Sequence, residues 1–97
     1  MNEDIQNNQI YERNADVALR VIENEAVILT PHDNVLHQLN NVGTDIWQLL
    51  NGKRSVQEVI DEMSQIYEAS NERIALDTMS FLLQMREKKL IFLKATK

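Results

Sequence analysis

Few side chains in this sequence have the types and spacings that perform catalysis or bind metal ions. The two histidines, His32 and His37, are separated by a predicted turn, and no further ligand stands at metal-binding spacing from His37. The chain has no cysteine, which excludes disulfides, thiolate metal sites and thiol nucleophiles. With only two glycines it has no glycine-rich phosphate loop. We therefore expect no catalytic residue, metal site or cofactor, and we predict that the protein is not an enzyme.

The groups best suited to recognition are the backbone N–H and C=O groups of a short uncharged stretch, residues 35–40. The candidate binding residues on it are Val35, Leu36, His37, Gln38 and Leu39. The stretch contains neither proline nor charge, the features with which proteins usually protect an edge strand. Two alternatives stay open: either residues 90–94 or a helix covers this edge, or the edge is left free for a peptide strand.

Two strands precede this stretch and make it the third strand of an antiparallel meander. Residues 17–22 alternate with a period of two, which predicts a strand. The pair 23–24, Glu-Asn, forms a tight turn because asparagine tolerates positive φ. The apolar run 26–30 predicts a strand buried on both faces or covered by helices. Residues 31–34, with proline first and Asp-Asn last, form the next turn.

A first helix follows the third strand. One asparagine of the pair 40–41 caps it, and apolar residues recur at helical spacing over 42–50. Trp47 lies in this helix, and we interpret it as a core residue. Gly52 ends the helix by supplying a left-handed turn. The basic pair 53–54 is then interpreted as a solvated turn.

Two longer helices complete the predicted fold. Ser55 and Glu58 form a capping box, in which each side chain accepts a hydrogen bond from the other residue's backbone N–H. An amphipathic helix with one apolar stripe follows over 56–67. The pair 70–71 caps a third helix over 72–88.

The third helix carries two apolar stripes, whereas a helix on the outside of a small domain needs one. The first stripe comprises Ile74, Phe81, Leu82 and Met85; the second comprises Leu76, Met79 and Leu83, continued by Arg86. The second stripe indicates either deeper burial against the sheet or one wall of a groove. If it is a groove, the opposite wall is formed by Val35 and His37 or by Leu36 and Gln38.

Together these elements predict an α+β fold of winged-helix-like arrangement, a three-stranded antiparallel sheet followed by three helices. We expect residues 1–15 to be a flexible N-terminal arm and residues 16–94 to be the folded domain. The fold is shared with DNA-binding proteins, but the net charge is −5 and the third helix begins with the acidic and apolar sequence 72–77. We therefore expect no nucleic-acid partner, and DNA regulation is kept as an alternative.

The sequence shows no segment suited to a membrane. No apolar run approaches the roughly 18–20 residues that a membrane-spanning helix needs. The first eight residues are polar and acidic, unlike a secretory signal. We expect a cytoplasmic protein without a membrane partner.

One set of residues has a combined spacing that is typical of a known family: Leu29, Pro31, Leu39, Asn40, Gly43, Ile46, Trp47, Leu49, Leu50, Gly52, Ser55, Val56, Glu58, Val59, Ile60, Tyr67, Asp77, Phe81, Leu82 and Leu90. Through these residues the sequence resembles the PqqD family over residues 14–93. The family's Gly-aromatic pair after the last helix is replaced here by the sequence 88–91. The chain thus departs from the pattern of pyrroloquinoline quinone synthesis, which leaves other peptide pathways open.

The resemblance implies a peptide chaperone. Such a domain binds the leader of a ribosomally synthesised precursor as an added strand, in a cleft between the third strand and the third helix. It then presents the peptide to a modifying enzyme, such as a radical S-adenosylmethionine protein or a lasso-peptide protease and cyclase. Arg86 then either pairs with a leader carboxylate or is a solvated charge. A third alternative is a structural subunit of a larger assembly, in which the same edge pairs with another protein.

Overall fold

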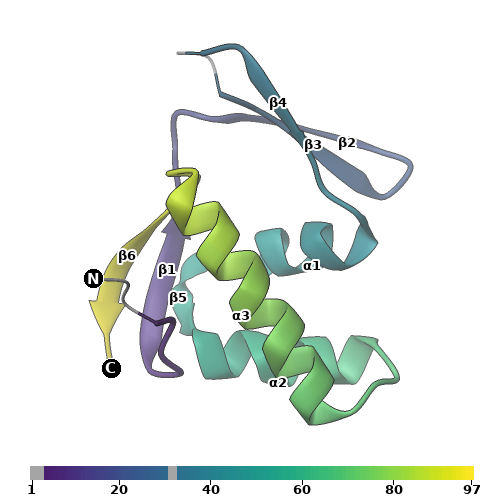
Figure 1. Cartoon of the computed structure of the whole chain (residues 1–97), viewed down its shortest axis with the longest axis vertical. Helices are drawn as coiled ribbons and strands as arrows, with labels where there is room; N and C mark the ends of the chain where they lie inside the picture. Colours follow the sequence, from purple (N-terminus) through teal and green to yellow (C-terminus); the bar gives the residue numbers. More distant parts are fainter. Residues whose placement is uncertain (1–3, 31–32) are drawn as a thin grey trace.

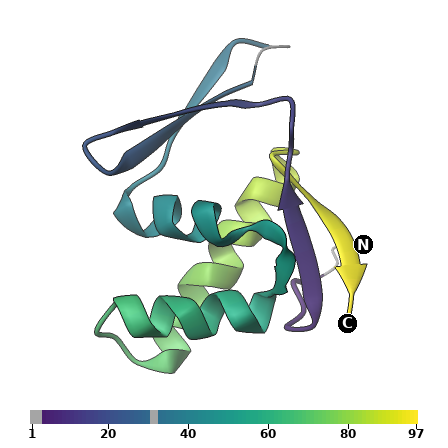
Figure 2. The same ribbon diagram turned by 180° about the vertical axis from the view of Figure 1, so that it is seen from behind.

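The computed structural model describes residues 4–30 and 33–97. Within these residues the elements follow in the order β1 (Gln9–Arg13), β2 (Ala18–Ile22), β3 (Glu25–Thr30), β4 (Val35–Gln38), α1 (Asn41–Leu49), β5 (Asn51–Ser55), α2 (Val56–Ile66), α3 (Asn71–Glu87) and β6 (Ile91–Thr96). Figures 1 and 2 show two separate sheets, β2–β4 at one end of the molecule and β1, β5 and β6 beside the helices. The α+β class with an antiparallel sheet before the helices is confirmed.

The predicted meander forms one sheet with the strand order β2-β3-β4. Its first turn has positive φ at both central residues, 52° at Glu23 and 69° at Asn24, as a two-residue hairpin turn requires. The strand β3 buries only one face, through Ala26, Ile28 and Thr30. Of the two alternatives for this strand, burial on both faces is therefore wrong, because no helix among the described residues covers the outer side of this sheet. The turn expected over 31–34 lies partly outside the described residues.

A second sheet, with the order β5-β1-β6, was not predicted. Its central strand is β1, where Tyr11 is 1% exposed, so this part of the predicted flexible arm is wrong. The sequence of this stretch shows no strand pattern, because Ile10 and Tyr11 are isolated apolar residues among polar ones. The strand is formed by pairing with segments far along the chain: Ile10 pairs with Ser55, and Arg13 pairs with Ile91. The folded domain therefore includes β1 and extends to Thr96.

The partners of β1 also correct two smaller expectations. The basic pair 53–54 lies in β5 rather than in a solvated turn, and Gly52 in the same strand has a φ of 77°. The terminal stretch 90–94 does not cover β4; most of it forms β6 and pairs with β1. The C-terminal segment therefore pairs with β1 in the second sheet, beside the helices, and does not pair with β4 (Figure 1).

The helix N-caps were predicted correctly, whereas the expected end of the first helix at Gly52 is wrong, because α1 ends at Leu49 and Gly52 lies in β5. The side chain of Asn40 accepts a hydrogen bond from the Gly43 N–H at 2.8 Å and starts α1. Ser55 and Glu58 form the capping box of α2, with distances of 3.2 Å and 2.9 Å. Ser70 accepts from the backbone N–H three residues on and starts α3. These caps set where each helix begins and hence how the helices meet.

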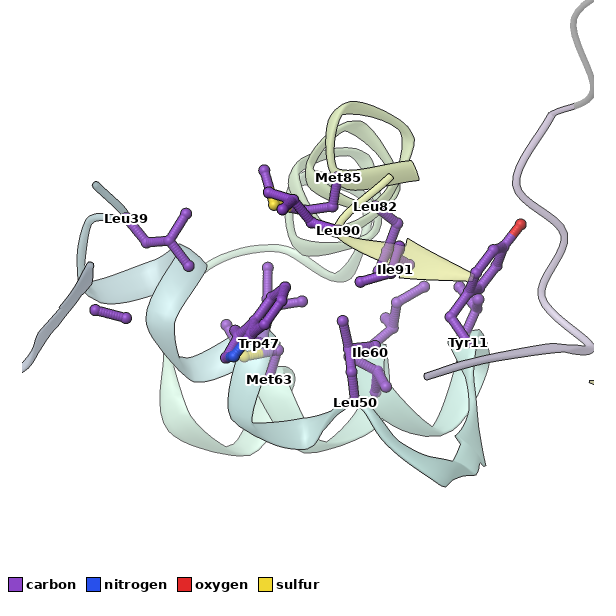
Figure 3. Packing of buried hydrophobic residues seen from close by; sticks show 14 of the residues in the cluster. Tyr11, Leu39, Trp47, Leu50, Ile60, Met63, Leu82, Met85, Leu90 and Ile91 are labelled. Atoms are coloured by element: carbon purple, nitrogen blue, oxygen red, sulfur yellow. The ribbon is translucent and has the colours of Figure 1, made fainter. Parts of the chain in front are cut away.

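One buried cluster joins all three helices to both sheets. Trp47 is 1% exposed, which confirms its interpretation as a core residue. Figure 3 shows it in the common interior with Met63 of α2, Leu82 of α3 and Leu90, which directly precedes β6. The core fixes α3 against α1 and thereby sets the position of α3 relative to β4.

Candidate functional site

The described residues contain no group of three or more histidine, cysteine, aspartate or glutamate side chains placed to hold a metal ion. His37 lies in β4, and His32 lies outside the described residues. None of the helices over 4–30 and 33–97 combines the length and apolar character needed to cross a bilayer.

The strand β4 is an edge of its sheet, and no strand in the described ranges pairs with its outer side. The Leu39 N–H donates to the Ala26 carbonyl at 2.8 Å, and His37 stands opposite Ile28. Because backbone groups alternate in direction along an antiparallel strand, the N–H and C=O groups of Leu36 and Gln38 face away from β3. The edge therefore presents two donors and two acceptors to an incoming strand.

A groove of about 350 Å³ lies between this edge and α3. Its lining residues are Leu36, His37, Gln38, Leu39, Asn40, Gly43, Phe81, Gln84, Met85 and Lys88. Four of the five binding residues predicted in the stretch 35–39 thus line it, and Val35 does not. We call this space the edge groove.

The register of β4 settles which of its side chains point toward the helices. Residues directly opposite each other in an antiparallel pair lie on the same face. His37 is opposite the fully buried Ile28, so its side chain and that of Val35 share the inner face. Leu36 is on the outer face and is 66% exposed, and it borders the groove at the strand edge.

The α3 wall of the edge groove differs from the one predicted. It is formed by residues at positions i, i+3, i+4 and i+7 of one helix face, namely Phe81, Gln84, Met85 and Lys88. The predicted wall residues Leu76, Met79, Leu83 and Arg86 do not line it. The groove wall therefore uses Phe81 and Met85 of the first apolar stripe, together with the polar residues Gln84 and Lys88 beside them.

The second apolar stripe of α3, with Arg86 that continues it, does not face the edge groove. Leu76 is 68% exposed on the far side of α3, and Met79 packs against the core. The Arg86 guanidinium donates to the Tyr11 hydroxyl at 3.2 Å, so it reaches toward β1 rather than β4. This contact could not be foreseen, because β1 itself was not predicted.

Gly43 determines how closely α1 approaches α3 beside the groove. A Cβ atom at this position would lie 2.9 Å from Phe81 Cε1 and 3.4 Å from the Asn40 side-chain oxygen. The absence of a side chain thus lets the Phe81 ring lie against the first turn of α1. The ring forms part of the groove lining at this point.

The groove continues between α1 and α3 into a second hollow of about 340 Å³. The two hollows share Asn40, Gly43, Phe81 and Gln84. Among the described residues that line the edge groove, Lys88 is the one lysine or arginine. The lining of the second hollow includes an exposed ion pair, in which Arg73 Nε lies 3.1 Å from Asp77 Oδ2. A long, mostly uncharged channel therefore begins at the open strand edge and follows α3.

A family model described as "Coenzyme PQQ synthesis protein D (PqqD)" matches residues 25–91 of this chain. Among curated proteins, no relative matches the sequence. The matched range includes β3, β4, the three helices and the whole lining of the edge groove.

Several solved structures share the fold. The structure titled "TbiB1 in Complex with the TbiA(beta) Leader Peptide" has a TM-score of 0.75 at 24% identity and covers 89% of this chain and 98% of that one. A lasso peptide synthetase B1 complexed with its leader peptide has a TM-score of 0.75 at 17% identity and covers 84% and 96%. The PqqD truncation of Methylobacterium extorquens PqqCD, titled a stand-alone RiPP recognition element, has a TM-score of 0.75 at 21% identity and covers 91% and 94%.

Proposed function

Because this chain belongs to the PqqD family, we propose that it binds the leader of a ribosomally synthesised precursor peptide as an added strand along β4. The observation that carries this proposal is the unpaired outer edge of β4 beside the edge groove. Two proteins of the same fold are described in complex with leader peptides, and a third as a recognition element for such precursors. These descriptions support the same kind of ligand for this chain.

Strand addition divides affinity and specificity between different groups. Main-chain hydrogen bonds provide affinity, and pockets for alternate side chains provide specificity. Here Leu36 and Gln38 supply the outward main-chain groups, and His37 and Leu39 contribute to the groove.

The α3 side of the groove supplies the remaining contacts. Phe81 and Met85 offer an aromatic and a flexible apolar surface, and methionine adapts readily to different ligand shapes. Gln84 offers a donor and an acceptor. The Lys88 ammonium is placed to attract an acidic leader residue, the role that the sequence had suggested for Arg86.

We assign the chain a role as a binding module that presents the precursor to a separate modifying enzyme. This enzyme is a radical S-adenosylmethionine protein or a lasso-peptide protease and cyclase, and the neighbouring genes distinguish these classes. Since precursor peptides of this kind are made on ribosomes, we place the protein in the cytoplasm.

The test is a titration of the ¹⁵N-labelled chain with the synthetic leader of the precursor encoded beside its gene. We expect the largest amide shifts in β4 and along the groove-facing positions of α3, with small shifts in β1 and β6. A scrambled leader of the same composition is the control. Absence of binding, or shifts centred on β1 and β6, would refute the proposal.

A further inference from the structure

The strand β2 forms the second open edge of the meander, on the side opposite β4. In the part of the chain that the structure describes, β3 is the one strand that pairs with it, and all five of its residues are exposed. It contains no proline, and Arg20 is its one charged residue. The free backbone groups of such an edge pair readily with another extended chain. This strand therefore has the properties of a docking strand.

The register with β3 shows which backbone groups of β2 are free. The Ala26 carbonyl accepts a hydrogen bond from the residue that follows β4, so the backbone groups of the next residue, Val27, face β2. Val27 stands opposite Arg20, which therefore bonds to β3, and the N–H and C=O groups of Leu19 and Val21 point outward. The edge of β2 thus offers two donors and two acceptors, as many as the edge of β4.

The side chains of Leu19 and Val21 lie on the inner face of the sheet, where the helices leave them partly uncovered. They stand opposite the buried residues Ile28 and Ala26, yet they are 43% and 46% exposed. Each borders a hollow beside α1, of about 350 Å³ at Leu19 and about 260 Å³ at Val21. Two apolar side chains of a strand paired with β2 therefore have space on this face.

Arg20 determines which kind of strand fits this edge. Its side chain lies on the outer face, and no carboxylate among the described residues is within ion-pair distance of its guanidinium. If two copies of β2 paired antiparallel through all four free groups, Leu19 of each would stand opposite Val21 of the other, and the two Arg20 side chains would stand opposite each other. Like charges in this position destabilise a sheet, whereas opposite charges stabilise it. The edge therefore disfavours a second copy and favours a strand with an acidic residue opposite Arg20.

We propose that β2 is the docking strand for the modifying enzyme, which adds an extended segment with an acidic residue opposite Arg20 and apolar residues opposite Leu19 and Val21. This inference rests on the proposed function, in which the chain presents the precursor to such an enzyme. None of the residues that line the edge groove belongs to β2, so the leader and the enzyme can bind at the same time. The two added strands then lie four strand spacings apart, or about 19 Å.

Two variants of β2 test the inference. Val21→Pro removes an outward donor and keeps the ladder with β3, and Arg20→Glu reverses the charge that selects the partner. Each chain, with the leader bound, is titrated by calorimetry with the purified modifying enzyme encoded beside its gene. We expect Val21→Pro to weaken enzyme binding about tenfold and Arg20→Glu to weaken it about fivefold. Lys53→Glu, at an exposed position of β5, is the matched control, because it makes the same change of charge in the other sheet.

Two further measurements locate the contact. When the enzyme is added to the ¹⁵N-labelled, leader-bound chain, we expect the largest changes in the amide signals of β2. The leader itself should bind the wild type and both β2 variants with equal affinity, because β3 separates β2 from β4. Amide spectra of each variant, recorded first, confirm that the meander is intact.

The outcomes separate this inference from the proposed function. If the leader binds at β4, but both β2 variants bind the enzyme as tightly as Lys53→Glu does, or the enzyme does not bind, the inference is wrong and leader binding stands. A wild-type dimer that Val21→Pro dissociates in sedimentation experiments would also overturn it, because a second copy would then occupy β2. A chain that binds the enzyme through β2 and does not bind the leader would refute the proposed function alone.

Discussion

Proline at Leu36 or Gln38 removes an outward-facing donor of β4 without touching the β3–β4 ladder. Proline lacks the N–H group, and it is tolerated in edge strands where this group does not pair. Both residues are exposed, and their N–H groups face away from β3. We therefore expect Leu36→Pro and Gln38→Pro to fold with an intact meander, with the free energy of unfolding changed by less than about 1 kcal/mol.

The expected loss of leader affinity follows from the bond that is removed. A guest carbonyl that faces the proline is desolvated without a donor, which costs about 1–3 kcal/mol. Since about 1.4 kcal/mol corresponds to a factor of ten, the dissociation constant should rise roughly 5- to 140-fold for each variant. The two sites lie two residues apart on one edge, so the double variant should lose binding altogether.

Calorimetric titration with the leader measures this effect, and amide spectra confirm that β3 and β4 still pair. Leu36→Ala is the matched control, because it removes the side chain and keeps the N–H group. If Gln38→Pro retains its β3 contacts and binds the leader as tightly as the wild type, strand addition along β4 is refuted.

Three further predictions concern the groove, a helix cap and pH. Gly43→Ala places a Cβ atom 2.9 Å from Phe81 and displaces the ring; we expect about fivefold weaker leader binding by calorimetry, with stability nearly unchanged because alanine favours the helix. Ser55→Ala removes the α2 cap and should lower the free energy of unfolding by about 1 kcal/mol in urea. The hydrogen bond that Lys97 donates to Glu58, and next the one from the Ser55 backbone, lower the pKa of Glu58 from 4.5 to about 2. The contribution of ionised Glu58 to the free energy of unfolding is therefore complete above pH 4.5 and is lost as the pH falls toward 2. Glu58→Gln should accordingly flatten the pH dependence of urea unfolding over this interval.

Each of these predictions has a control on the same or a neighbouring element. Asn41→Ala on the exposed side of α1 should leave leader binding unchanged, and equal affinities for it and Gly43→Ala would contradict the steric argument. Ser80→Ala is the control for the cap, since its side chain caps no helix. Glu62→Gln removes a carboxylate on the same helix as Glu58, and an identical pH profile for the two variants would rule out the assigned role of Glu58.

The parts of the fold that depend on near neighbours were predictable from sequence. Asn40, Ser55 and Ser70 each bond a backbone N–H three residues away, so their types and positions alone predict the helix starts. The hairpin turn 23–24 is equally local. Residues 35–40 likewise predicted a strand without charge or proline, and the sequence left open whether its edge is covered.

The arrangement of the site depends on contacts between distant segments, and these were beyond the sequence patterns. The second sheet joins β1 to strands from the middle and the end of the chain, and neither β1 nor β5 has a strong strand pattern of its own. The C-terminal segment pairs with β1 in this sheet and is therefore not available to pair with β4. Arg86 donates a hydrogen bond to Tyr11 of β1, and the opposite wall of the edge groove is formed by another face of α3, which carries Phe81 and Met85.

The chain's own residue types thus determined the helix N-caps, the hairpin turn, the order of β2, β3, β4, α1, α2 and α3, and an edge without charge. The tertiary structure alone decided which side of α3 faces that edge and that β1, β5 and β6 join in a second sheet. The physical reason is that a helix with two apolar stripes has two ways to pack, and the choice between them is made by the core that the distant segments complete.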